Sequence, residues 1–155
     1  MARGPDADRI GDAARRLLES GAVGDDELRA SAKMGVPLLV VTPAGKGHSW
    51  FVPFVVGESL AAFLQLLSDG TFMRFSSFQR GPGRLEGLPM ASDWLDVSVI
   101  RERASTLARP GEHVATPVLT FDRDPSRLVW SVTLTTADGA SRAVFVAGAT
   151  AFPTS

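Results

Sequence analysis

The chain has 155 residues, of which 45% are hydrophobic and 21% charged, a composition typical of a globular protein that buries roughly 70% of its unfolded surface. Sixteen basic and 17 acidic residues give a net charge of −1, which provides no positive field to attract nucleic acid or an anionic membrane surface. The absence of cysteine excludes disulfides, thiolate nucleophiles and cysteine-ligated zinc.

Targeting and membrane signals are missing from the sequence. The N-terminal stretch lacks the apolar core of about 7 to 15 residues that marks a signal peptide. The longest apolar runs, at 36–41 and 50–56, are far shorter than the ~20 residues of a membrane helix. We therefore expect a soluble, cytoplasmic protein with one domain over residues 1–155 and disordered ends at 1–5 and 153–155.

Two helices are expected near the N-terminus. From Asp6 to Ser20 the apolar residues recur at helical spacing, and Gly21 follows as a stop signal. A second, shorter helical stretch begins at the acidic pair Asp25-Asp26 and is closed by Gly35 and Pro37.

Strand patterns follow. The β-branched run VPLLVVTP, at 36–43, predicts a buried strand. Residues 50–78 predict three antiparallel strands with turns at 57–58 and 68–70. The segment 60–67 also suits a helix by its Leu, Ala and Gln content, but the Asp-Gly turn that follows it favours a strand.

A loop and a further helix are predicted next. Residues 79–90 are rich in glycine and proline and predict a loop. From Ser92 to Leu107 the apolar spacing of three and four predicts a helix that Ser92 caps and Pro110-Gly111 ends. Valine and isoleucine in this segment leave a strand open as the other interpretation.

The C-terminal third predicts a three-stranded meander from the segments TPVLTF, RLVWSVTLTT and RAVFVAGATAF. In the middle segment apolar and polar residues alternate, so one face of the sheet should be apolar and needs a cover. We therefore predict an α+β fold, in which a curved antiparallel sheet of about five to seven strands has the N-terminal helices and one further helix packed on one face. The alternating sets are Arg127, Val129, Ser131 and Thr133 against Leu128, Trp130, Val132 and Leu134.

The segments that begin at Trp50 and Trp130 share a plan of a tryptophan near the start of a strand, a turn, and a second apolar strand. The hairpin Trp130–Val146, in which a W-x-V strand pairs with a V-x-V strand, resembles PepSY-type domains. This resemblance covers the hairpin alone and implies a cystatin-like or PepSY-like topology, with no activity. PepSY domains usually occur in exported or membrane proteins, and this chain carries neither signal. Tryptophan and β-branched residues also favour strands for packing reasons, so two similar hairpins need no common origin.

Residues suited to catalysis are sparse. His48 and His113 lie in predicted loops without an evident partner to make either one a base. The loop AGKGHS, at 44–49, lacks the spacing of a phosphate-binding loop. Asp122 and Asp124 fit turn chemistry better than a cation site. We expect no catalytic residue, no metal and no cofactor.

Phenylalanines gather in the middle third of the chain. In strand geometry Phe72 and Phe78 share one side and Phe75 lies on the other, so the sheet should be apolar on both sides there. A second apolar side indicates a pocket or an oligomer interface. The residues expected to bind a ligand or form an interface are Trp50, Phe54, Phe72, Arg74, Phe75, Phe78, Trp94, His113 and Trp130.

These patterns favour a non-catalytic protein-interaction or self-association module that binds a copy of itself, as a homodimer or larger homo-oligomer, or another protein, and neither nucleic acid nor a membrane. One alternative is a small-molecule-binding domain or small enzyme, with an apolar pocket between sheet and helix and an apolar ligand. Another is an immunity-like or regulatory partner protein, which no residue favours directly.

Overall fold

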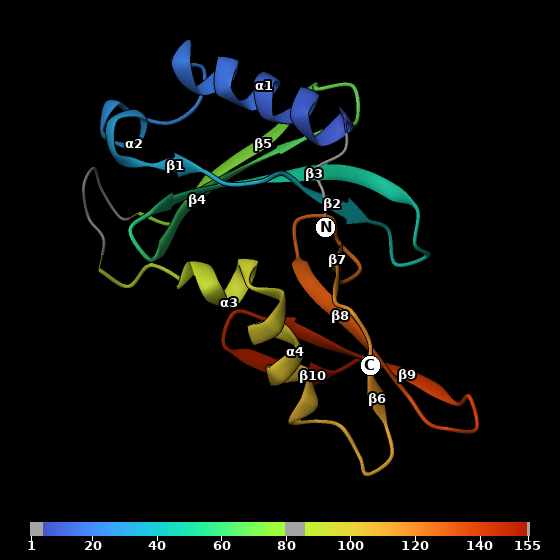
Figure 1. Ribbon diagram of the computed structural model, residues 1–155. Helices are drawn as coiled ribbons and strands as arrows, with labels where there is room; N and C mark the ends of the chain where they lie inside the picture. The colour runs from blue at the N-terminus through green and yellow to red at the C-terminus, as the bar shows by residue number, and fades with distance from the viewer. Residues whose placement is uncertain (1–4, 80–85, 155) are drawn as a thin grey trace. The chain divides into compact units, whose positions relative to one another are not determined.

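The computed structural model describes residues 5–79 and 86–154 (Figure 1). Within this part of the chain the α+β prediction is confirmed: helices combine with antiparallel sheets. The prediction of one sheet of five to seven strands is wrong, because the described strands form two sheets of five strands each. The strands within residues 33–77 pair only with one another, as do those within residues 113–153, so the two sheets are separate among the described residues.

The chain divides into two compact units. Unit 1 consists of Met1–Val40 and Gly47–Ala91, and unit 2 of Val41–Lys46 and Ser92–Ser155. That the chain folds as one domain stays a prediction. Of the ends expected to be disordered, Pro5 belongs to a helix and Pro153 to a strand, whereas residues 1–4 and 155 lie outside the described part.

Unit 1 has two helices followed by a sheet in the order β1-β3-β4-β5, with β2 also paired to β3. The pairs β1–β3, β3–β4 and β4–β5 are antiparallel, and the three strands predicted over 50–78, including a strand rather than a helix at 60–67, are confirmed. Its elements are α1 (Pro5–Glu19), α2 (Asp26–Ser31), β1 (Lys33–Met34), β2 (Leu38–Val41), β3 (Gly47–Val56), β4 (Ser59–Leu66) and β5 (Phe72–Ser77).

Helix α1 covers one face of this sheet and packs against β3 and β4 (Figure 1). Its residues Ile10 and Ala14 are fully buried together with Phe54 and Leu64 of the strands. Each large apolar side chain buried here contributes roughly 1.5–3 kcal/mol to folding. The helix predicted from Asp6 to Ser20 is confirmed.

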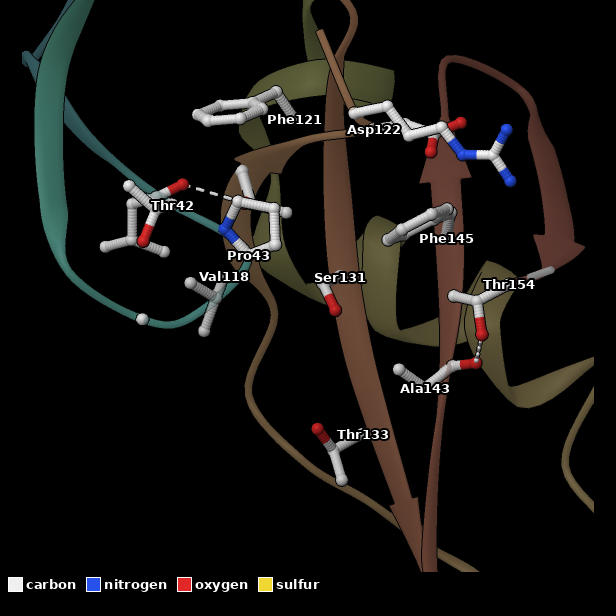
Figure 2. A pocket seen from close by; sticks show the side chains of 14 residues that line it. Thr42, Pro43, Val118, Phe121, Asp122, Ser131, Thr133, Ala143, Phe145 and Thr154 are labelled. Atoms are coloured by element: carbon white, nitrogen blue, oxygen red, sulfur yellow. Dashed lines mark hydrogen bonds between the residues drawn. The ribbon is translucent and has the colours of Figure 1, made fainter. Parts of the chain in front are cut away.

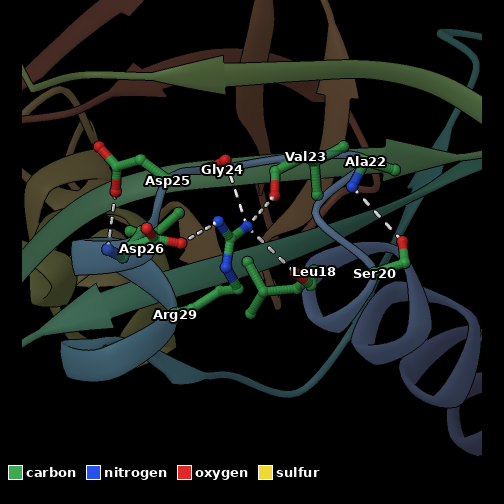
Figure 3. A network of polar contacts seen from close by, with 9 residues as sticks. Leu18, Ser20, Ala22, Val23, Gly24, Asp25, Asp26 and Arg29 are labelled. Atoms are coloured by element: carbon green, nitrogen blue, oxygen red, sulfur yellow. Dashed lines mark hydrogen bonds and ion pairs between the residues drawn. The ribbon is translucent and has the colours of Figure 1, made fainter.

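The connection between α1 and α2 is held by one side chain. Arg29, on α2, donates a hydrogen bond to each of three backbone carbonyls and forms an ion pair with Asp26 at 2.7 Å (Figure 3). The carbonyl acceptors are those of Leu18, Val23 and Gly24, at 3.3, 3.2 and 3.3 Å. Arg29 therefore fixes where the second helix starts relative to the end of the first.

Several boundaries in unit 1 differ from the predictions. The second helix ends at Ser31 instead of Gly35, because Lys33 and Met34 pair with β3. Only Val40 of β2 is buried, since this short strand pairs with a single neighbour. Half of the predicted loop AGKGHS is strand, because β3 begins at Gly47. Of the predicted loop at 79–90, residues 80–85 lie outside the described residues, and residues 79 and 86–90 belong to no helix or named strand.

Unit 2 follows the same plan, with a sheet in the order β10-β9-β8-β6 and β7 also paired to β8. The three predicted strands are confirmed, and the last predicted segment is divided into two strands by a turn at Gly148, where φ is +59°. The elements are α3 (Ala91–Leu95), α4 (Val97–Ser105), β6 (His113–Val114), β7 (Val118–Phe121), β8 (Leu128–Thr135), β9 (Ser141–Ala147) and β10 (Thr150–Pro153).

The helix predicted from Ser92 to Leu107 is confirmed in type but is not continuous. It breaks at Asp96, whose carboxylate accepts a hydrogen bond from the Ser98 N–H at 2.9 Å and so caps α4. Asp96, and not the predicted Ser92, is the N-cap of the longer helix. The strand interpretation of this segment is wrong.

Helix α4 packs against β6, β8, β9 and β10 of its own unit. The face of the sheet on this side carries the apolar half of the alternation in β8, namely Trp130, Val132 and Leu134, all of which are buried. The prediction of one apolar face on this strand is confirmed. The side chains of Ser131 and Thr133 point to the opposite face.

The two sheets are a structural repeat with an offset of 80 residues. Several pairs of strand partners in the first sheet recur in the second, and the backbone hydrogen bond from the Gly35 N–H to the Pro53 carbonyl recurs from the Ala115 N–H to the Thr133 carbonyl. The hairpin resemblance between Trp50 and Trp130 is therefore part of a correspondence over three strands of each sheet, β1, β3 and β4 in unit 1 and β6, β8 and β9 in unit 2. The matching Cα pairs are Lys33–Val55 and His113–Thr135, Val52–Leu64 and Val132–Val144, and Trp50–Leu66 and Trp130–Val146.

Candidate functional site

The candidate functional sites in the part of the chain that the structure describes are binding surfaces. Among residues 5–79 and 86–154, no three His, Asp or Glu side chains gather in a way that could hold a metal ion. No helix of the described part is long and apolar enough to cross a membrane. Two features stand out, the outer edge of β5 in unit 1 and a cavity in unit 2.

Strand β5 is the last strand of its sheet and, among residues 5–79 and 86–154, pairs with β4 alone. Seven of the eight residues of β4 are buried, whereas no residue of β5 is. The Phe78 N–H donates to the Ala61 carbonyl at 2.8 Å. Because hydrogen-bonded pairs alternate along an antiparallel ladder, the Ser76 N–H also faces β4, while the N–H groups of Phe75 and Ser77 face away from it.

The aromatic side chains of β5 lie on both sides of the sheet. Phe75 packs against Phe54 in the core under α1, with ring centroids 6.4 Å apart. Phe78 instead contacts Phe63, at 5.8 Å. Phe72 and Phe78 are 49% and 38% exposed, so this strand presents apolar surface at both of its ends.

The prediction that Phe72 and Phe78 share one side of the sheet is wrong. Gln65 pairs with Arg74, but the next residue, Leu66, pairs with Phe72. One extra residue therefore lies in β5 at this point, and an extra residue moves the following side chain to the other face. Phe72 lies opposite Leu66, on the α1 side.

Arg74 is part of a buried polar network that links three strands. The fully buried Gln65 donates from Nε2 to the Ser49 Oγ at 2.7 Å and accepts at Oε1 from the Arg74 Nε at 2.7 Å. His48 Nδ1 lies 3.0 Å from the same Ser49 oxygen, and the Arg74 guanidinium lies 5.0 Å from the Phe63 ring centroid. The network satisfies the buried amide and holds β3, β4 and β5 together.

The remaining predicted site residues lie apart from these surfaces. Trp50 packs against the core cluster under α1, and Phe54 is fully buried within it. Trp130 is buried in unit 2, where its indole N–H donates to the Trp94 carbonyl at 2.9 Å. His113 is exposed on β6. The predicted set thus mixes core residues with residues of the β5 edge.

The cavity of unit 2 has a volume of about 470 Å³. Ser131 and Thr133 of β8 and Ala143 and Phe145 of β9 form its floor (Figure 2). It lies on the sheet face opposite α4, and none of its described lining residues belongs to a helix. The small-molecule alternative from the sequence places an apolar pocket between sheet and helix, whereas this cavity lies on the other face of the sheet. On the α4 side, Val132 and Leu134 of β8 are buried.

One wall of the cavity comes from the segment Val41–Gly45. The Thr120 hydroxyl donates to the Val41 carbonyl at 2.7 Å, and the Thr42 N–H donates to the Lys46 carbonyl at 2.7 Å, so this segment is a closed turn. At the β7 end of the cavity the Asp122 carboxylate lies 3.5 Å from the Arg127 guanidinium.

Sequence reasoning missed the cavity residues. A signal was present, because Ser131 and Thr133 alternate with buried apolar residues and mark the second face of β8. The strand beside it carries the small residue Ala143 directly opposite Thr133. Small residues facing each other on one sheet face leave space above the sheet, but this inference needs the register of β8 and β9, which the sequence does not provide.

Among the described residues, Glu112 is the acid whose pKa is lowered most, and its ion pair with Arg142 is structural. Arg142 donates to both oxygens of Glu112, at 2.9 and 2.8 Å, and the Glu112 side chain is only 4% exposed. The hydrogen bond from Arg142, and then that from the Arg109 N–H, lowers the pKa of Glu112 to about 2. In unit 1 the positions 80 residues earlier hold Ala32 and Ala62, so the repeat does not require this ion pair.

Comparison of the chain with protein-family models, with curated proteins and with solved structures gives no match. The resemblance of the Trp130–Val146 hairpin to PepSY-type and cystatin-like domains therefore stays a prediction.

Proposed function

We propose that this chain is a non-catalytic interaction module that self-associates by pairing the outer edge of β5 with β5 of a second copy. The observation that carries this proposal is the pair of outward-facing N–H groups, at Phe75 and Ser77, on a strand with exposed aromatic residues at both ends. An edge strand with unpaired backbone groups is a template for a further strand.

The sequence of β5 supports a second copy as the partner. Natural edge strands are usually protected by lysine, proline or inward-pointing charges, and FMRFSS has none of these except Arg74. The Arg74 side chain is turned onto Gln65 and Phe63. Two copies whose β5 strands pair antiparallel, centred on Phe75, therefore do not bring two exposed charges of the same sign together. A two-fold axis through Phe75 would let both copies exchange the same backbone bonds.

A proline at position 77 tests the proposal. Ser77→Pro removes an N–H that points away from β4 and leaves the β4–β5 ladder intact, while Ser77→Ala keeps the N–H and serves as the matched control. Losing one bond from each copy should cost about 1–3 kcal/mol, or roughly 5- to 150-fold in dimer affinity. Sedimentation equilibrium should therefore give similar dimer dissociation constants for the parent chain and Ser77→Ala and a roughly 5- to 150-fold larger one for Ser77→Pro. At concentrations between the two constants the parent is a dimer and Ser77→Pro a monomer.

Thermal unfolding separates this result from a folding defect, since a folded, monomeric Ser77→Pro variant is the outcome expected. A parent chain that stays monomeric at 100 micromolar or above would refute self-association. A Ser77→Pro dimer as stable as the parent dimer would show that the copies associate through another surface.

A further inference from the structure

We infer that the cavity of unit 2 binds a small, uncharged molecule with a flat apolar ring and one or two hydrogen-bonding groups. The cavity shares no residue with β5, so this inference does not rest on the self-association proposed above. It rests on a comparison of the two repeats and on the groups that line the cavity floor.

The two sheets differ in the size of the side chains on the face that forms the cavity floor in unit 2. Unit 1 carries bulky side chains there, and the rings of Phe51 and Phe63 stack 4.7 Å apart with 27° between their planes. Unit 2 carries small side chains at the corresponding positions, so the space above its strands is open. The corresponding pairs are Phe51 and Ser131, Pro53 and Thr133, and Phe63 and Ala143.

The floor of the cavity places hydroxyl groups beside an aromatic ring. Ser131 pairs directly with Phe145 across β8 and β9, which puts their Cβ atoms about 4.5–5.5 Å apart. Phe145 lines the cavity and contacts Phe152 with centroids 5.8 Å apart and planes at 70°, so its ring can pack against the ring of a ligand. Among the described residues, the hydroxyls of Ser131 and Thr133 make no hydrogen bond. A hydroxyl both donates and accepts.

The charges around the cavity argue against an ionic ligand. The floor has no charged side chain, and the two ionisable residues of the lining, Asp122 and Arg123, have opposite charges. Asp122 already faces Arg127. An ion in this cavity would lose hydration without gaining a net counter-charge. The volume of about 470 Å³ lies in the range of roughly 300–1,000 Å³ that is typical of small-ligand pockets.

The test uses 2-naphthol as the probe and naphthalene as the same ring system without the hydroxyl. Titration of ¹⁵N-labelled protein with 2-naphthol should shift the amide signals of Ser131, Thr133 and Phe145 in a saturable way. Naphthalene should bind about tenfold more weakly, since it lacks one hydrogen bond. The double variant Ser131→Ala/Thr133→Val should lose this preference for 2-naphthol while keeping the cavity.

Filling the cavity with a larger side chain is the second part of the test. Ala143→Phe introduces the residue type that unit 1 has at the corresponding position, and it should weaken 2-naphthol binding at least about tenfold by occupying the site. Ser141→Phe, on the same face of the same strand but outside the lining, is the matched control and should bind as the parent does. Unchanged binding by a folded Ala143→Phe variant, or no saturable shift of the cavity amides in the parent, would overturn the inference.

Discussion

Gly35 lies close to Pro53, and this contact gives a prediction that can be tested against the corresponding residues of unit 2. A Cβ added at Gly35 would lie 2.7 Å from the Pro53 Cγ, and the Gly35 N–H donates to the Pro53 carbonyl at 2.9 Å. The backbone cannot retreat from the clash without losing this hydrogen bond. Gly35→Ala should therefore destabilise the protein.

The magnitude follows from two opposing effects. Overpacking of this kind costs about 1–3 kcal/mol, and replacing glycine by alanine gains about 0.4–1 kcal/mol by restricting the unfolded chain. The expected net loss is about 0.5–2 kcal/mol in the free energy of unfolding, measured by urea denaturation followed through tryptophan fluorescence. Gly47→Ala is the matched control, because its new Cβ would lie 3.9 Å from the nearest atom, Leu39 Cδ1, and it should be neutral or slightly stabilising.

Unit 2 has Ala115 and Thr133 where unit 1 has Gly35 and Pro53, and the backbone bond between them is kept at 3.0 Å. Adding Pro53→Thr to Gly35→Ala should therefore recover most of the lost stability. The double-mutant cycle should give a favourable coupling of about 0.5–2 kcal/mol. A Gly35→Ala variant as stable as Gly47→Ala, or a coupling energy of zero, would refute the correspondence between the two positions.

Two further predictions concern polar contacts. Arg29→Met keeps the side-chain stem but removes three hydrogen bonds to carbonyls, so the free energy of unfolding should fall by about 1–3 kcal/mol. The control Arg15→Met removes an exposed pair with Asp12 and should change the free energy of unfolding by less than about 0.5 kcal/mol. Equal effects of the two variants in urea denaturation would contradict the role given to Arg29. The pKa of Glu112 is lowered from 4.5 to about 2, so its contribution to stability is fully present above pH 4.5 and is lost as the pH falls toward 2. The stability difference between the parent and Glu112→Gln should therefore shrink across this window in urea titrations, and a difference that is independent of pH would count against the ion pair.

The sequence predicts helices and strands correctly where residues close together in the chain determine them. The helix at Pro5–Glu19 and the strand at Ser59–Leu66 follow from apolar spacing and from a strong turn signal. The break at Asp96 was not predicted, because a capping aspartate interrupts a helical pattern without changing its apolar period. The two-residue strand Lys33–Met34 is too short to show any alternation.

The division into two sheets could not be predicted because alternation shows which residues form strands but not which strands pair. The repeat was equally hidden: over the matching sheets the identical residues include the pairs Trp50 and Trp130, and Val52 and Val132, but few others. Packing conserves the pattern of buried positions, and different apolar residues satisfy it. The cavity depends on the register of β8 and β9, which the sequence does not show, so its residues were not predicted. The aromatic residues of β5 were predicted from composition alone.

Amide hydrogen exchange at two protein concentrations tests the proposed self-association most directly. The N–H groups of Phe75 and Ser77 face away from β4, while that of Ser76 faces it. If β5 pairs with a second copy, the Phe75 and Ser77 amides should exchange rapidly in dilute solution and become protected at high concentration, with the Ser76 amide protected in both. Exchange of Phe75 and Ser77 that does not change with concentration would contradict the account.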